Sequence, residues 1–324
     1  MIVDSHAHLV PPDLVTAIRK EHARFPGVRL IDEAGGLALG FSGGKPTRPI
    51  GKGLMDIPGR LAWMEKQQID RQVVGGWVDM FGYQLPPAEG EAWSRLANDV
   101  LLATSKSDRR FVPLATVPLQ DGARAAAVLK DAVNAGFPGA MIATLPRGIG
   151  SVLDDPDLEP FWKAADETGA VVLIHPSFDA GDTRVEAYGL ANAVGRISDA
   201  LVAVSRLICS GHITRYANAK FFAPMGGAAL PFVAGRLKRN ADLTPGMADP
   251  FESLRLLYTD TIVHDPRVLK FVIEVMGTER LLLGSDMPFP IGDLEPMRIL
   301  KQAELKPDQI ASIGGDLAAK IFRL

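Results

Sequence analysis

The sequence predicts an α/β fold of the (β/α)₈ TIM-barrel class. Three observations predict it: eight short apolar stretches recur along the 324 residues, helix-like stretches separate several of them, and the chemically reactive residues follow different predicted strands. A doubly wound open sheet shows the same alternation. Barrel enzymes, however, carry their sites at the carboxyl ends of the strands. The position of the reactive residues therefore favours the barrel.

Eight strands are predicted, which is the number that an eightfold barrel requires. In chain order they are Met1–Val3, Gln72–Trp77, Phe111–Thr116, Ala140–Ala143, Val171–Ile174, Lys220–Ala223, Leu256–Thr259 and Leu281–Leu283. The clearest helix-like stretches are Glu91–Ser105, Gly122–Ala135, Leu158–Thr168 and Pro266–Met276. The segment Pro26–Pro58 is rich in glycine and proline without a sustained period, so we predict a long loop excursion there. No linker divides the chain, and we expect one domain over residues 1–324.

Composition and charge exclude several classes of partner. Hydrophobic residues make up 47% of the chain and charged residues 23%, which is ordinary for a globular protein. A formal net charge of −3 provides no basic field for nucleic acid or anionic lipid. Cys209 is the only cysteine, so no internal disulfide can form and a reducing compartment is expected. With neither a secretory signal nor an apolar run of about eighteen residues, we expect a cytoplasmic protein.

A candidate metal site begins at the first strand, where Asp4-Ser5-His6-Ala7-His8 follows the apolar start of the chain. Two histidines two residues apart in an extended segment point the same way, so His6 and His8 can bind one metal together. Divalent ions such as zinc accept neutral imidazole, and a catalytic site adds further ligands and keeps a position for water or substrate. His175 after the fifth predicted strand and Asp286 after the eighth are the natural further ligands.

The alternative for a lone His-X-His is a pair of surface or core histidines. Here the two histidines belong to a set whose members all follow strands and so meet at one barrel mouth. The set of His6, His8, His175 and Asp286 therefore predicts one divalent metal ion.

Several motifs resemble the decarboxylase-type branch of the amidohydrolase superfamily, and within it the aminocarboxymuconate semialdehyde decarboxylase family. The resemblance spans nearly the whole chain. The stretches that carry it are Val3–His8, Arg109–Val112, Gly136–Gly139, Ile174–Pro176, Tyr258–Asp260, Val263–Pro266, Leu283–Pro290, Gly292 and Glu295–Pro296. The resemblance implies a barrel, one zinc or manganese ion, and decarboxylation of an unsaturated or aromatic acid. It also implies a homodimer, because an arginine such as Arg236 can reach a neighbouring subunit's site in relatives.

One position departs from the family pattern. Relatives carry a histidine before the glycines that follow the sixth strand, whereas this chain has Met225 followed by Gly226 and Gly227. In the family that histidine is the candidate base for a metal-bound water, and a thioether has no useful proton affinity. The methionine could be an engineered substitution, a sign of chemistry that needs no such base, or a mark of lost catalysis. We favour the second.

Direct decarboxylation fits a site without this base. Asp286 can be both metal ligand and proton shuttle, because a carboxylate beside a divalent cation can hold or release a proton. The resemblance places Arg48 where an arginine holds a substrate carboxylate, and it places Asn192 in the substrate wall where the relatives named above have tryptophan. Three hypotheses follow. We favour a metal-dependent non-oxidative decarboxylase of an unsaturated or aromatic carboxylic acid in a catabolic pathway. The alternatives are a metal-dependent hydrolase of a ring, amide or carbon–carbon bond, and a non-catalytic binding protein.

Overall fold

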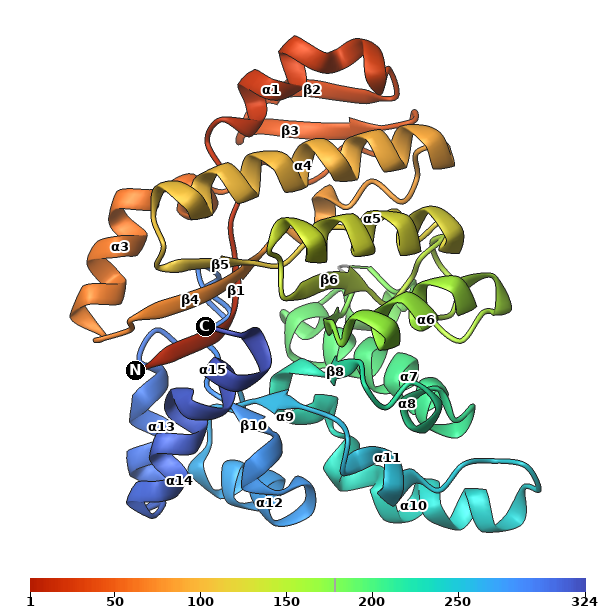
Figure 1. The fold of residues 1–324 in the computed structure, drawn as a ribbon, viewed down its shortest axis with the longest axis vertical. Helices are drawn as coiled ribbons and strands as arrows, with labels where there is room; N and C mark the ends of the chain where they lie inside the picture. The colour runs from red at the N-terminus through yellow and green to blue at the C-terminus, as the bar shows by residue number, and fades with distance from the viewer. Residues whose placement is uncertain (178) are drawn as a thin grey trace.

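Among the residues that the structure describes, eight parallel strands form the centre of the molecule (Figure 1). The computed structural model describes residues 1–177 and 179–324. The parallel strands are β1 (Val3–His8), β4 (Arg71–Gly75), β5 (Phe111–Pro113), β6 (Gly139–Ala143), β7 (Val171–His175), β8 (Lys220–Phe222), β9 (Thr259–Asp260) and β10 (Leu281–Leu282). Each overlaps one of the eight predicted strands.

The strands follow one another in a TIM-barrel-like α/β fold. Their order is β1-β4-β5, β6-β7-β8 and β9-β10. Parallel bridges Ala115 to Ala140, Phe222 to Tyr258 and Ala7 to Met287 link these groups to one another. The amide of Ser5 also donates to the carbonyl of Leu283 at 2.8 Å. These bonds bring the carboxyl ends of β1, β7 and β10 to one end of the fold.

Helices cover the strands on the outside, and their ends follow capping signals in the sequence. The main covering helices are α3 (Ile57–Lys66), α4 (Pro87–Ser107), α5 (Gly122–Ala135), α6 (Glu159–Thr168), α7 (Arg196–Cys209), α10 (Leu230–Leu243), α12 (Pro266–Met276), α13 (Pro296–Gln302), α14 (Pro307–Ala311) and α15 (Leu317–Phe322). The Asp265 carboxylate caps α12 by accepting from the Arg267 amide, and Pro266 stands in the first turn. Gly136 ends α5 with φ 109°, in the left-handed region that favours glycine.

Alternation along β7 separates two parts of the core. Val172 and Ile174 pack outward among residues of the covering helices. Val171 and Leu173 pack inward in a second cluster. Each central strand, or a residue next to it, contributes to this cluster, and so does α15. Since side chains alternate along a strand, His175 falls on the same inner face as Val171 and Leu173.

The segment predicted as a loop contains regular structure, so that prediction is wrong. Strands β2 (Val28–Glu33) and β3 (Gly36–Phe41) form an antiparallel hairpin, and α2 (Lys52–Met55) follows. The hairpin buries Val28, Leu39 and Phe41 against Trp93 of α4 in a third apolar cluster. Tertiary packing against α4 and α1 (Leu14–Glu21) thus stabilises strands whose glycine-rich composition indicated a loop.

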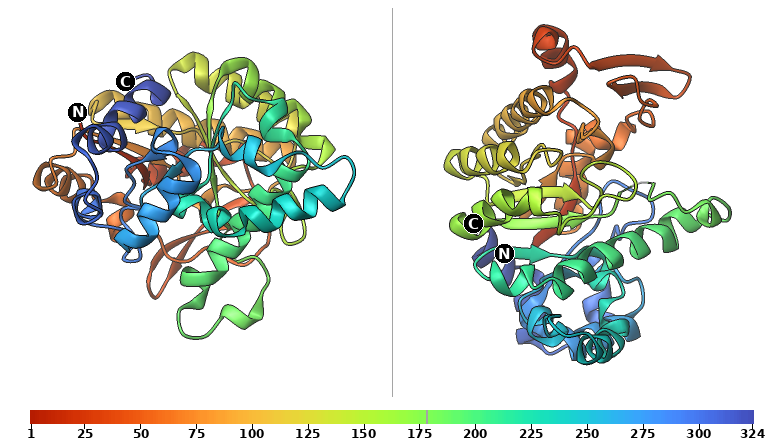
Figure 2. Two further views of the ribbon diagram at one scale, coloured as in Figure 1. Left: turned by 90° about the horizontal axis from the view of Figure 1, so that it is seen from below. Right: turned by 90° about the vertical axis from the view of Figure 1, so that its right-hand side faces the viewer.

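Two excursions project on the same side of the molecule. Figure 2 shows the β2–β3 hairpin and residues 179–195 extending from the body together. The described parts of the chain contain no helix that is both long enough and apolar enough for a membrane crossing.

Candidate metal centre

Four side chains that the sequence brought together as metal ligands converge in the structure. His6 and His8 belong to β1, His175 is the last residue of β7, and Asp286 follows β10. One ligand atom from each lies within 4.8 Å of the others, and all four residues are buried. The three imidazole centroids are 4.7 to 5.4 Å apart. The structure thus assembles a buried group of three histidines and one carboxylate that could hold a metal ion.

An irregularity in β1 turns its two histidines inward. Val3 packs in the inner cluster, whereas Ala7 packs in the outer one. Residues 3 and 7 would share a face in a regular strand, but the register with β4 shifts between Asp4 and Ala7. The shift leaves His6 and His8 on the inner face.

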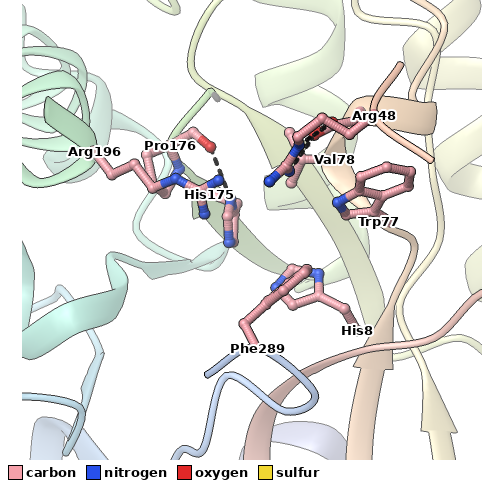
Figure 3. Close-up of a pocket in the computed structure, with 9 residues that line it drawn as sticks. His8, Arg48, Trp77, Val78, His175, Pro176, Arg196 and Phe289 are labelled. Carbon is pink, nitrogen blue, oxygen red and sulfur yellow. Dashed lines mark hydrogen bonds and ion pairs between the residues drawn. The ribbon is translucent and has the colours of Figure 1, made fainter. Parts of the chain in front are cut away.

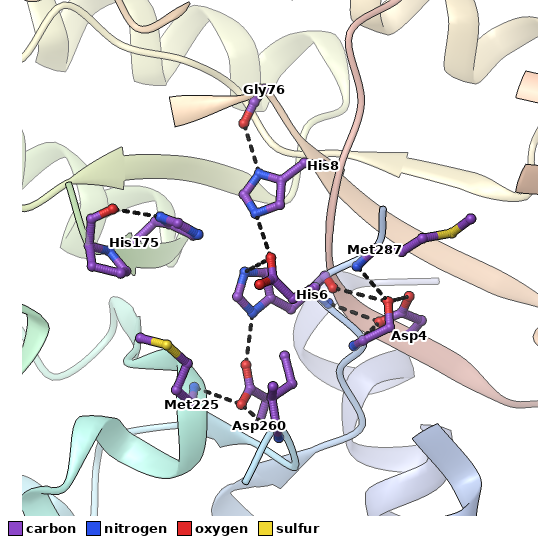
Figure 4. A network of polar contacts seen from close by, with 12 residues as sticks. Asp4, His6, His8, Gly76, His175, Met225, Asp260 and Met287 are labelled. Atoms are coloured by element: carbon purple, nitrogen blue, oxygen red, sulfur yellow. Dashed lines mark hydrogen bonds and ion pairs between the residues drawn. The ribbon is translucent and has the colours of Figure 1, made fainter. Parts of the chain in front are cut away.

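The rings of His8 and His175 are oriented by backbone carbonyls. Nδ1 of His8 lies 3.1 Å from the carbonyl oxygen of Gly76, and Nδ1 of His175 lies 2.8 Å from that of Pro176 (Figure 4). A carbonyl can only accept, so Nδ1 carries the proton in both rings. Nε2 then carries no proton, and its lone pair can bind a metal ion.

Asp260 orients His6. Its Oδ2 lies 2.8 Å from Nδ1 of His6. Its Oδ1 accepts from the amides of Met225 at 2.7 Å, Ile262 at 3.1 Å and Gly226 at 3.3 Å (Figure 4). Four donors converge on one buried carboxylate, which fixes its position and leaves Nε2 of His6 facing Asp286.

Electrostatics keep Asp286 ionised and two of the histidines neutral. Burial lowers the pKa of His175 well below its ordinary value, and it also lowers the pKa of His8. Burial alone would raise the pKa of Asp286, but contact with His8 and the charge of His6 lower it. Burial likewise opposes protonation of His6, yet Asp260 and Asp286 raise the pKa of that ring. Carboxylate and neutral imidazole are the protonation states that bind metal.

Three buried polar atoms of this site have no hydrogen-bond partner, and their arrangement shows whether a metal ion would fit there. Nε2 of His6, Nε2 of His8 and Oδ1 of Asp286 are buried without a hydrogen-bond partner. The Asp286 oxygen is 3.1 Å from His8 Nε2 and 3.8 Å from His6 Nε2. Buried polar atoms nearly always have a partner. A divalent cation between these atoms supplies one, and nitrogen with carboxylate oxygen is a donor set that zinc and manganese accept.

Asp4 ties Asp286 to the first strand. Its carboxylate accepts from the Ser285 amide at 2.9 Å and from the Ser285 hydroxyl at 2.5 Å. The Asp286 amide donates to the His6 carbonyl at 2.8 Å. Asp286 itself has φ 57°, which is unusual for a residue with a side chain. The loop is therefore held in a strained conformation by bonds to β1, and this presents the carboxylate to the histidines.

A small pocket opens beside the histidines (Figure 3). It encloses about 200 Å³. Its lining is partly aromatic and partly cationic: His8, Arg48, Trp77, Asp79, His175, Arg196 and Phe289 take part. A small acid would meet a ring surface and two guanidinium groups there.

The four predicted substrate residues lie in different places. Arg48 lines the pocket, over the Trp77 ring, and its Nε and Nη2 donate to Asp79 at 3.0 and 3.1 Å. Met225 is half-buried beside the metal centre with its amide on Asp260. Asn192 is exposed and is not among the described residues of the pocket. Arg236 is exposed on α10.

Sequence reasoning gave no role in the site to Asp260, Arg196, Trp77, Asp79 or Phe289. Asp260 follows the seventh predicted strand as Asp286 follows the eighth, so the same rule about strand ends could have identified it. Arg196 stands in an amphipathic helix, and only the tertiary packing brings it to the pocket.

Comparison with known proteins shows the family. A family model described as Amidohydrolase matches residues 3–324. The chain belongs to this family, which confirms the resemblance seen in the sequence.

Relatives of the chain are named as decarboxylases. A 2-amino-3-carboxymuconate-6-semialdehyde decarboxylase from Dictyostelium discoideum is 28% identical, covering 92% of this chain and 85% of the relative. A protein of the same name from Caenorhabditis elegans is 26% identical, covering 94% of this chain and 89% of the relative. The chain is also similar to the crystal structure of 5-carboxyvanillate decarboxylase from Sphingomonas paucimobilis, with a TM-score of 0.80, 25% identity, and coverage of 100% of this chain and 99% of that one.

A further solved structure shows the fold alone, because it is 19% identical. It is a 5-carboxyvanillate decarboxylase from Novosphingobium aromaticivorans, complexed with manganese and 4-hydroxy-3-methoxy-5-nitrobenzoic acid. Its TM-score is 0.81, and the match covers 100% of this chain and 96% of that one.

Proposed function

We propose that this protein is a metal-dependent, non-oxidative decarboxylase of a small aromatic or unsaturated carboxylic acid. The observation that carries the proposal is the convergence of three oriented histidines and Asp286 beside an arginine-lined pocket. The family and the decarboxylase names of the relatives support the same reaction class. We also propose that the eight central strands close into a complete barrel, since bonds join each strand to its neighbour.

His6, His8, His175 and Asp286 would hold the ion. When bound, a divalent metal supplies Lewis acidity toward a substrate oxygen and so favours the electron density that loss of carbon dioxide leaves behind. We propose Zn²⁺ as the resident ion and Mn²⁺ as the alternative.

Asp286 moves the proton. Decarboxylation replaces a carbon–carboxylate bond with a carbon–hydrogen bond, so one proton from solvent must reach the carbon as carbon dioxide leaves. Asp286 is the carboxylate of the centre, and its Oδ1 is buried without a hydrogen-bond partner. With Oδ1 toward the ion, the other oxygen of this carboxylate can take the proton and pass it to the substrate, because general acids act within hydrogen-bond reach of the reacting atom.

Arg48 and two aromatic rings position the acid. A guanidinium fork pairs with a carboxylate through two hydrogen bonds. Asp79 accepts from Nε and Nη2 of Arg48 and so orients the guanidinium, whose other edge would meet the substrate, and the Trp77 ring lies under it, 5.2 Å from Cζ to the ring centroid. The Phe289 ring lies 5.2 Å from the His8 ring and covers the other side of the pocket (Figure 3). These rings exclude water while Arg48 holds the substrate.

Met225 fits the direct reaction better than hydrolysis. Hydrolysis needs an activated water, and the thioether cannot take a proton. In Figure 4 the Met225 side chain lies by His175 and Asp260, where it adds apolar surface to the metal centre. A direct decarboxylation, in which Asp286 alone moves the proton, needs no base at this position.

Product analysis tests the proposed function. The metal-loaded protein is incubated with a panel of aromatic and unsaturated acids, and products are identified by mass spectrometry. Loss of carbon dioxide without addition of water supports the proposal, with Asp286→Asn as the inactive control. Addition of water without loss of carbon dioxide would show a hydrolase instead.

We further propose a homodimer that involves α10. Phe232 on this helix is 82% exposed, and Arg236 lies one turn further along the same helix. The family resemblance places an arginine such as Arg236 at a neighbouring subunit's site, so Phe232, one turn before it, lies where an interface between subunits would be. Sedimentation of the wild type and of Phe232→Asp tests this: the wild type should be a dimer and the variant a monomer.

A further inference from the structure

Arg60 is a buried cation on one of the covering helices. It belongs to α3 and is only 1% exposed, although an arginine is almost never fully buried unless its charge has partners. Its Nη1 donates to Oε1 of Gln72 at 2.8 Å, and its Nη2 donates to the carbonyl of His8. One guanidinium therefore joins α3 to β4 and to the end of β1, at a residue of the metal centre.

Gln72 joins Arg60 to a second buried charge. Its side chain is fully buried on β4, and its Nε2 donates to Oδ2 of Asp4 at 2.8 Å. The amide thus turns its oxygen to a guanidinium and its nitrogen to a carboxylate. The reverse orientation would set donor against donor and acceptor against acceptor. Arg60, Gln72 and Asp4 therefore form one hydrogen-bond chain with a fixed direction.

This hydrogen-bond chain ends beside Asp286. Asp4 accepts from the amide and the hydroxyl of Ser285, and the Ser285 hydroxyl oxygen accepts from the Met287 amide at 3.0 Å. Ser285 and Met287 are the two neighbours of Asp286 in the sequence. The bonds that start at the carbonyl of His8 thus reach both sides of the carboxylate that faces it, with 3.1 Å between His8 Nε2 and Asp286 Oδ1.

We propose that Arg60 is a positioning residue that acts through Gln72 to set the distance between His8 and Asp286 for one metal ion. This inference rests on the proposed function, in which His8 and Asp286 are metal ligands. Ligand distances in metal sites stay within about 0.2 Å of their preferred values. A buried donor or acceptor that loses its partner costs free energy until the backbone shifts to satisfy it. Loss of either link should therefore move one ligand relative to the other.

Metal binding by two variants and their combination tests the inference. The variants are Arg60→Met and Gln72→Met, which remove hydrogen bonds but keep an unbranched side chain in the core. Lys66→Met is the matched control, because Lys66 is a cation on the same helix but is exposed. Competition with a chromogenic chelator gives the Kd of Zn²⁺, and the visible absorption of bound Co²⁺ reports the geometry of its ligands.

Each single variant should weaken Zn²⁺ binding about tenfold, the lower end of the range for residues that orient ligands, and should change the Co²⁺ spectrum. Because both residues act through one hydrogen-bond chain, the double variant should bind Zn²⁺ as each single variant does, whereas independent defects would multiply. Lys66→Met should match the wild type in both measurements. If an apolar variant does not fold, Arg60→Lys and Gln72→Asn replace the pair. The lysine lacks the fork and the asparagine is one methylene shorter, so the same pattern is expected.

Two results would overturn the inference. Arg60→Met could have a lower Tm but the Kd and the Co²⁺ spectrum of the wild type, as a purely structural role predicts. Alternatively, the losses of the two single variants could multiply in the double variant. Failure of the proposed function gives a different result. A wild type that binds no Zn²⁺ would refute both, whereas coupled losses of metal affinity without release of carbon dioxide would refute the proposed decarboxylation alone.

Discussion

Nδ1 of His6 lies 2.8 Å from Oδ2 of Asp260, and both residues are buried. This contact decides which nitrogen of His6 faces Asp286. With the proton on Nδ1, the lone pair on Nε2 points into the centre of the group of ligands. Asp260 therefore orients His6 for metal binding without itself touching the substrate.

We predict that Asp260→Asn weakens metal binding about 10- to 100-fold. Three backbone amides donate to Oδ1 of Asp260. If the asparagine oxygen keeps those three bonds, its amide nitrogen faces His6, and the imidazole proton must move to Nε2. Competition with a chromogenic chelator measures the Kd of the metal.

Asp131→Asn is the matched control for this variant, because Asp131 pairs with Arg95 at the surface. Its metal Kd should equal that of the wild type. An unchanged Kd in Asp260→Asn would show that the hydrogen bond does not orient His6.

Removal of the metal should destabilise the fold. A ligand that binds only the native state at 100 times its Kd stabilises it by about 2.7 kcal/mol. Chelation should therefore lower the Tm by several degrees, and added Zn²⁺ or Mn²⁺ should restore it. Differential scanning calorimetry measures the shift. The variant His6→Ala/His8→Ala should show no shift, and an equal shift in both proteins would place the metal elsewhere.

We predict that Arg48→Ala lowers kcat/KM by the equivalent of about 2–4 kcal/mol, the cost of a lost bidentate carboxylate contact. Arg29→Ala, a change of an exposed arginine on the same hairpin excursion, should leave kcat/KM unchanged. Steady-state kinetics on the best acid of the panel measure both. If Arg48→Ala lowers kcat/KM by less than about threefold, well under 1 kcal/mol, Arg48 pairs with Asp79 but does not bind the substrate.

We expect Met225→His to give little gain in turnover. Met225 has φ 56°, a conformation that histidine tolerates better than most residues, so the variant should fold. If direct decarboxylation needs no base here, kcat should stay within about threefold of wild type, since a base that mattered would raise it about 10²–10⁴-fold. Met225→Leu, which keeps the apolar surface, is the control. A gain in that range would show that the site lacks a base that it needs.

The sequence predicted the strands because each is a short apolar run, and it predicted the ligands because each follows or ends such a run. Helices α5 and α12 were predicted with the same bounds that the structure has, because Asp121 and Asp265 cap their starts and Gly136 and Gly277 follow their ends. The β2–β3 hairpin was missed, since its stability comes from packing on Trp93 rather than from its own composition.

Other features of the site have no local signal. The register shift in β1 depends on pairing with β4, so the sequence could show that His6 and His8 share a face but not that this face is the inner one. Arg196 looks like any polar residue of an amphipathic helix, and its role depends on where α7 packs. Asn192 lies one turn before Arg196 but is exposed. Only the three-dimensional structure shows that Arg196 lines the pocket and Asn192 does not.

The most direct test of metal-dependent decarboxylation is a measurement of carbon dioxide release. One preparation of the protein is measured before and after its metal is removed. The substrate is the best acid of the panel labelled in its carboxyl group, and the released gas is collected. We predict release by the metal-loaded protein, none after chelation, and recovery on addition of Zn²⁺ or Mn²⁺, with Asp286→Asn inactive throughout. Release that persists at the same rate in the chelated protein or in Asp286→Asn would contradict a reaction carried by the group of His6, His8, His175 and Asp286.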